Sequence, residues 1–107
     1  MAQFINRFDV CLISLSPTIG TEIQKTRPCL IVSPNSFNSG SKIVIAPMTS
    51  KRKVNAMRVP ILFKDIEGDI VLEHIRSVDK LRVLKKIGSI EDQIGILVLE
   101  KLRTFFS

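Results

Sequence analysis

Short apolar runs separated by polar breaks recur along the chain and predict a protein made mainly of β-strands. The first run, at residues 9–15, is rich in aliphatic residues and stops at Ser16-Pro17. Further strands are predicted at residues 29–33, 42–47, 57–63, 70–75 and 83–87. Proline, glycine, asparagine or serine separates most of these runs, so the pattern predicts about five to seven short strands in an antiparallel sheet.

The apolar pattern changes to a helical period near the C-terminus. From about residue 90 to residue 106, apolar residues recur at positions 94, 97, 98, 102 and 105, on one face of an α-helix. Ser89 and Asp92 are typical of a capping box at the start of this helix, and residues 77–81 predict one helical turn. No linker or repeat divides the sequence, so we expect one domain over residues 1–107. Its fold class is mainly β (α+β), with one helix packed against a curled antiparallel sheet.

Charge narrows the range of partners. Sixteen Lys and Arg residues against ten Asp and Glu give a net charge of +6, which favours nucleic acid or an acidic protein as a partner. A small basic domain can also carry charge only for solubility, and that alternative stays open. Six Phe and no Trp or Tyr argue against a surface of stacked aromatic rings. No segment approaches the roughly 20 apolar residues of a membrane span, so we expect a cytoplasmic protein without a membrane anchor.

Familiar metal, nucleotide and nucleophile motifs are missing from the sequence. Cys11 and Cys29 lie in strand-like runs without the spacing of a zinc site, so we interpret them as reduced core residues. His74 is the only histidine, and neither a GxSxG motif nor a phosphate-binding loop accompanies it. Acidic residues alternate over 65–69 as in a calcium loop, but the glycine is misplaced. We therefore expect no metal site and no cofactor.

The remaining polar residues gather at predicted strand ends. They are Glu22, Gln24, Lys25 and Arg27 after the first strand, residues 49–53 after the third, and Glu73, His74 and Arg76 later. Strand ends of a small barrel can converge into one site. RNA suits such a site because its own 2′-hydroxyl can attack the adjacent phosphorus, so the protein needs to supply only a base, an acid and positive charge.

Each group also has a structural interpretation. Arg27 could pair with Glu22 on the surface, Thr49 could close a strand, and residues 51–53 could be a solvated loop. Glu73 and His74 are neighbours in a predicted strand and therefore point to opposite faces. Both cannot enter one site through side-chain direction alone.

Taken in order, several motifs resemble those of the MazF/PemK family. Residues 16–22 (SPTIGTE) and the Thr-Arg-Pro that begins residues 26–34 resemble the N-terminal signature. Residues 45–50, an apolar strand ending in Pro-Met-Thr-Ser, resemble the second motif, and residues 71–79 resemble the third. The ordered set, rather than any single motif, carries the resemblance, which covers residues 9–106.

The resemblance implies an SH3-like antiparallel β-barrel and a homodimer. It implies a growth-inhibiting toxin of a type II toxin-antitoxin system, paired with a cognate antitoxin of the MazE/PemI type. It also implies a sequence-specific, metal-independent endoribonuclease that cuts single-stranded RNA and leaves a 2′,3′-cyclic phosphate and a 5′-hydroxyl. A CcdB-like inhibitor of DNA gyrase and an inactive RNA-binding module remain as alternatives on the same fold.

Carried over residue by residue, the resemblance assigns catalysis to Arg27 and Thr49. Because arginine has a pKa above about 12, Arg27 would clamp the phosphate or protonate the leaving oxygen, while Thr49 would orient the phosphate. Glu22 is the first candidate for the general base and Glu73 the second. The candidates for RNA binding are Gln24, Lys25, Ser50, Lys51, Arg52, His74 and Arg76.

Overall fold

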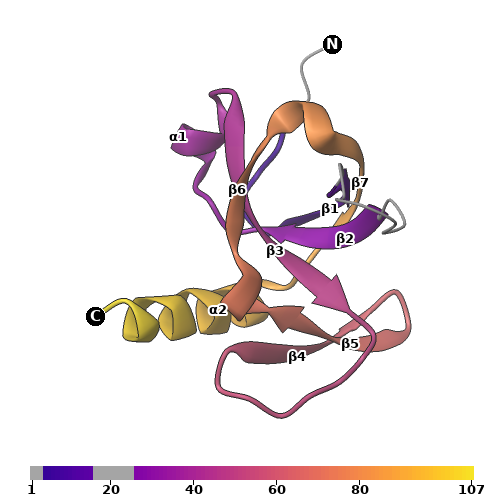
Figure 1. Ribbon diagram of the computed structural model, residues 1–107, viewed down its shortest axis with the longest axis vertical. Coiled ribbons are helices and arrows are strands. Elements are labelled where there is room, and N and C mark those ends of the chain that lie inside the picture. The colour runs from indigo at the N-terminus through magenta and orange to yellow at the C-terminus, as the bar shows by residue number, and fades with distance from the viewer. Residues whose placement is uncertain (1–3, 16–25) are drawn as a thin grey trace, which may run out of the picture.

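A curled antiparallel sheet forms most of the molecule, and a C-terminal helix lies against it (Figure 1). The computed structural model describes residues 4–15 and 26–107. The strands in these ranges are β1 (Asp9–Ser14), β2 (Thr26–Ile31), β3 (Lys42–Thr49), β4 (Arg58–Phe63), β5 (Ile66–Val71), β6 (Arg76–Asp79) and β7 (Val83–Ser89). The helices are α1 (Asn35–Asn38), α2 (Asp92–Phe105) and the 3₁₀ turns η1 (Leu72–His74) and η2 (Lys80–Arg82). This half-barrel with one terminal helix confirms the predicted fold class.

β3 is the central strand of the sheet. The strands follow the order β4-β5-β3-β2-β1-β7, and β6 also pairs with β3. One edge of β3 pairs with β2, while its other edge pairs with β6 along the first half and with β5 at Met48 and Thr49. The C-terminal end of β3 therefore lies where the sheet passes to the β4–β5 hairpin.

Both faces of β1, β2 and β3 are covered, which explains why these strands read as continuous apolar runs. Alternate residues belong to two separate clusters, because successive side chains of a strand point to opposite faces. Val10, Leu30 and Ala46 belong to a cluster that includes Val98 of α2. On the other face lie Cys11, Ile13, Cys29, Ile31, Ile43 and Ile45.

The terminal helix is present as predicted, but its start and its buried face differ from the prediction. Ile94, Val98 and Leu102 pack against the core, whereas Leu97 and Phe105 are 38% and 61% exposed. The predicted capping box is wrong, because Ser89 belongs to β7 and lies opposite Asp9 of β1. Glu91 precedes the helix and makes no side-chain capping hydrogen bond.

The β4–β5 hairpin turns through Lys64 and Asp65, whose φ angles of 51° and 66° match a tight turn with two left-handed residues, and β5 begins at Ile66. Two other local predictions differ from the structure. The predicted strand at residues 70–75 ends at Val71, and η1 follows it. Of residues 77–81, expected as one helical turn, residues 77–79 pair with β3 in β6, where Val78 packs into the core, and only residues 80 and 81 belong to the 3₁₀ turn η2.

Cys11 and Cys29 lie directly opposite each other across β1 and β2. Both are buried and both are free thiols, which confirms their interpretation as reduced core residues. None of the helices in the described ranges has both the length and the apolar character needed to cross a bilayer.

Candidate active site

Arg27 and Thr49 lie at the ends of β2 and β3, just beyond the residues at which these two strands pair. Cys29 lies opposite Pro47, and Arg27 and Thr49 each lie two residues beyond that pair. Their side chains point to the same face as that pair, because every second residue of a strand shares a face. Pairing of β2 with β3 extends only over Cys29–Ile31, while Arg27 pairs with Ile13 of β1. The ends of β2 and β3 therefore part at these two residues.

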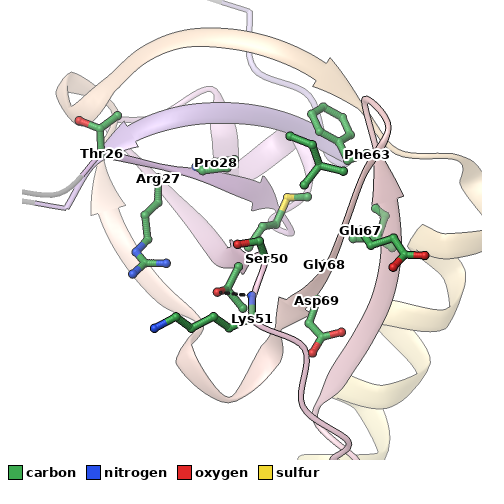
Figure 2. A pocket seen from close by; sticks show the side chains of 13 residues that line it. Thr26, Arg27, Pro28, Ser50, Lys51, Phe63, Glu67, Gly68 and Asp69 are labelled. Atoms are coloured by element: carbon green, nitrogen blue, oxygen red, sulfur yellow. Dashed lines mark hydrogen bonds between the residues drawn. The ribbon is translucent and has the colours of Figure 1, made fainter.

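A pocket of about 680 Å³ opens between these strand ends and the β4–β5 hairpin. Its polar wall comes from β2, the end of β3 and the residues that follow: Thr26, Arg27, Thr49, Ser50 and Lys51. Its apolar wall comes from Pro28, Met48, Ile61, Phe63 and Ile66, and the acidic residues Glu67 and Asp69 line it from β5. In Figure 2, the Arg27 and Lys51 side chains point toward the same region of this pocket.

The hydroxyl of Thr49 is fixed by the turn that leaves β3. Its Oγ1 accepts a hydrogen bond from the backbone N–H of Lys51 at 3.2 Å, drawn as a dashed line in Figure 2. The hydroxyl proton is thus left to donate toward the pocket. Arg27 and Lys51 add two cations, and a guanidinium can donate two parallel hydrogen bonds to phosphate oxygens. This wall of the pocket suits an anionic ligand.

Asp69 is a charged group buried in the wall of the pocket. Its side chain is 1% exposed and accepts hydrogen bonds from Arg52 Nε at 2.8 Å and from the Lys53 backbone N–H at 2.8 Å. A third bond comes from Arg58 Nη1 at 3.3 Å. Burial alone would raise the pKa of Asp69, but the three hydrogen bonds outweigh it and hold that pKa below its ordinary value.

The structure places the predicted site residues unevenly. Arg27, Thr49, Ser50 and Lys51 come together in the pocket. Arg52 instead binds Asp69 through its Nε and is absent from the pocket lining. Glu22, Gln24 and Lys25 lie outside the described residues.

Glu73, His74 and Arg76 do not line the pocket. Glu73 and His74 are exposed residues of η1, so the prediction that they alternate along a strand is wrong. Glu73 Oε1 lies 3.6 Å from Arg58 Nε and accepts a hydrogen bond from Asn55. Arg76 of β6 lies opposite Ile45 of β3, on the same face as Arg27.

Burial raises the pKa of the Cys29 thiol, whereas the positive charges of Arg27 and Arg76 act to lower it.

Asp69 and the apolar wall of the pocket are not among the site residues predicted from the sequence. The acidic residues over 65–69 suggest only a calcium loop, whereas the Asp69 carboxylate forms salt bridges with Arg52 and Arg58. Across residues 4–15 and 26–107, no group of three or more His, Cys, Asp or Glu side chains is placed to hold a metal ion. The position of Asp69 opposite Thr49 would have indicated its role, but that position follows from the β3–β5 register, which the sequence alone does not give.

Fold and pocket together define a small β half-barrel protein with a pocket at its strand ends, one wall of which carries Arg27 and Lys51. Residues 6–106 match the family model described as "PemK-like, MazF-like toxin of type II toxin-antitoxin system". The chain therefore belongs to this family of toxins. The match is to PemK and MazF rather than to CcdB, so the gyrase-inhibitor alternative is not favoured.

Individual relatives agree with this assignment. Over 47 residues the chain is 47% identical to the endoribonuclease PemK of Escherichia coli, a stretch that spans 43% of this chain and 35% of that protein. The fold is similar to MazF of Deinococcus radiodurans, with a TM-score of 0.82, 21% identity and 98% of each chain covered. It is also similar to an endoribonuclease from a mycobacterial species solved with its cognate antitoxin, with a TM-score of 0.77 and 20% identity over 94% of this chain and 92% of that one.

Proposed function

We propose that this chain is the ribonuclease component of a toxin-antitoxin pair and cuts single-stranded RNA by attack of a ribose 2′-hydroxyl on the adjacent phosphorus. The observation that carries the proposal is the joint presence of Arg27, Thr49 and Lys51 in one pocket. The chain belongs to a toxin family, and the PemK to which part of it is similar is named an endoribonuclease.

The reaction needs few groups from the protein. The 2′-oxygen attacks phosphorus while the bond to the 5′-oxygen breaks, which leaves a 2′,3′-cyclic phosphate and a 5′-hydroxyl. Arg27 stabilises the charge that develops on the phosphate oxygens and can protonate the leaving 5′-oxygen, while the Thr49 hydroxyl donates to a phosphate oxygen. Because RNA supplies the nucleophile, the chemistry needs no metal ion, and we propose metal-independent cleavage.

The general base belongs to the same proposal. Asp69 is unsuited to it, because its carboxylate already accepts three hydrogen bonds. Glu73 lies outside the pocket and is held near Arg58. Glu22, which lies outside the described residues, therefore stays our first candidate, and Glu67 on the wall of the pocket joins it. In Figure 2 the Glu67 carboxylate points away from Arg27, which favours Glu22.

Partners and location follow from the same proposal. We expect a homodimer and a cognate antitoxin that places an acidic segment over the wall of the pocket that carries Arg27 and Lys51, since such a segment mimics the charge of RNA. Among similar structures, MazE–MazF complexes and a toxin–antitoxin complex are known. The substrate implies a cytoplasmic site of action, where messenger RNA is translated.

The direct test is cleavage of RNA by the purified chain in excess chelator. A long single-stranded transcript should be cut at a short recurring sequence, and mapping of the new 5′ ends gives that sequence. Trapped gyrase–DNA complexes in expressing cells, with intact RNA, would instead support the CcdB-like alternative. Binding of the transcript without any cleavage would support an inactive RNA-binding module.

A further inference from the structure

We infer that Asp69 is a positioning residue that, through Arg58, holds the Thr49–Lys51 turn in its active geometry. This inference rests on the proposed function, because it names what fixes the proposed catalytic threonine. Asp69 does not need to touch RNA for this role. Its carboxylate is already occupied by groups of the protein.

Two hydrogen-bonded links connect Asp69 to the turn. Arg58 Nη1 donates to Asp69 Oδ2 at 3.3 Å and to the backbone carbonyl of Lys51 at 2.9 Å, so one guanidinium nitrogen joins the two. The backbone N–H of Lys53 donates to Asp69 Oδ2 at 2.8 Å, which fixes the chain two residues further on. Arg52, which lies between Lys51 and Lys53, donates from its Nε to the other carboxylate oxygen of Asp69, Oδ1, at 2.8 Å.

The backbone leaves little freedom where these links meet. Thr49 lies opposite Asp69 in the β3–β5 register. A Cβ added to Gly68, the residue beside Asp69, would lie 2.4 Å from the carbonyl oxygen of Thr49, so the two strands approach closely only because residue 68 is glycine. The Thr49 hydroxyl accepts from the N–H of Lys51, the same residue whose carbonyl Arg58 holds. Orientation of that hydroxyl therefore depends on the Asp69–Arg58 pair.

Burial protects the Asp69–Arg58 pair. The Asp69 and Arg58 side chains are 1% and 14% exposed, so little water competes for the hydrogen bond between them. Removal of the Asp69 charge leaves Arg58 with a neutral acceptor and frees the Lys51 carbonyl to move. Misplacement of a catalytic group by about 1 Å can lower a rate by roughly a hundredfold. The loss falls on the chemical step rather than on RNA binding, because Arg27 and Lys51 keep their charges.

The test compares Asp69→Asn with Asp65→Asn, which removes an exposed carboxylate from the turn of the same hairpin. Steady-state cleavage of a short RNA carrying the mapped target sequence should show kcat about ten to a hundred times lower for Asp69→Asn. Its KM should stay within about threefold, and Asp65→Asn should match the unsubstituted chain. Unchanged kcat in Asp69→Asn would overturn the inference.

A double-mutant cycle keeps the test valid if Asp69→Asn folds poorly. Arg58→Lys keeps the charge but loses the planar fork, so it should lower kcat to a similar extent, and the double variant should be no worse than either single one. Independent, additive losses would contradict a shared role. If Asp69→Asn cannot be purified folded, a kcat for Arg58→Lys equal to that of the unsubstituted chain overturns the inference.

Amide hydrogen exchange separates this inference from the proposed function. The Lys51 N–H should exchange faster in Asp69→Asn, while the N–H groups of β1 keep their protection. Should the unsubstituted chain fail to cut any RNA, the proposed function fails, and the exchange result alone decides whether Asp69 holds the turn. Unchanged protection of Lys51 would then reject it.

Discussion

Arg27 and Thr49 each lie two residues beyond the Cys29–Pro47 pair, at the point where β2 and β3 part, and both line one pocket. Twenty-one residues separate them in the sequence, and the sheet brings them onto one face. Thr49 in turn pairs with Asp69 of β5. A cation and a hydroxyl thus line one pocket, and a buried carboxylate lies opposite the hydroxyl on the next strand.

Replacement of Arg27 tests the proposed role of its guanidinium in RNA cleavage. Arg27→Ala should lower kcat/KM for RNA cleavage by about a hundredfold or more, because Arg27 is the only arginine among the described residues that line the pocket and so the only one there to offer a guanidinium fork to the phosphate. Arg27→Lys should recover only part of this loss, since a lysine cannot donate two parallel bonds. Arg103→Gln, on the exposed side of α2, removes the same charge and should keep full activity. Equal activity of Arg27→Ala and Arg103→Gln would contradict the assignment.

Protonation of Asp69 at acid pH should lower the free energy of unfolding. The pKa of this carboxyl lies below its ordinary value of 3.8 in the folded state, so its charge stabilises the fold fully above about pH 4. That stabilisation is lost as the pH falls through the lowered pKa. The difference in free energy of unfolding between the unsubstituted chain and Asp69→Asn should therefore shrink below about pH 4. Urea unfolding followed by circular dichroism at several pH values measures it; a difference independent of pH would be inconsistent with this account.

The two buried thiols should resist alkylation. Burial raises the pKa of Cys11 to about 11 and that of Cys29 to about 12, so at about pH 8 almost no thiolate is present. Iodoacetamide should modify the folded chain at least about a hundred times more slowly than the chain in concentrated urea, as followed by intact mass. Rapid modification of either thiol without denaturant would show that β1 and β2 open readily.

Gly95 of α2 packs against the ring of Phe8. A Cβ at this position would lie 2.3 Å from that ring, and Phe8, the residue before β1, has a φ of 74°. Gly95→Ala should destabilise the fold by about 1–3 kcal/mol through overpacking, despite the better helix propensity of alanine. In Gly40→Ala the added Cβ would lie 3.4 Å from the backbone carbonyl oxygen of Phe37, so this substitution should have a smaller effect on stability. Equal stabilities in urea would show that Phe8 can move aside.

The sequence pattern predicted the strands and the terminal helix well, because alternating burial and helical period are local properties. It placed Arg27 and Thr49 at strand ends but could not bring them into one pocket, since that depends on which residues pair across β2 and β3. Glu73 was assigned to a strand because residues 70–75 are apolar around it, whereas the chain turns at η1 to start β6. Asp69 was overlooked as an anchor, because a buried carboxylate is recognisable only from the distant arginines that bind it.

In the proposed reaction, the RNA itself supplies the nucleophile at the Arg27–Thr49 pocket. Two short RNAs with the mapped target sequence should be compared in excess chelator, one of them with a single 2′-deoxy nucleotide on the 5′ side of the cut. We predict that the all-ribose RNA is cut to a 2′,3′-cyclic phosphate and a 5′-hydroxyl, and that the substituted bond stays intact. Cleavage of the 2′-deoxy bond, or products with a 5′-phosphate, would contradict the account.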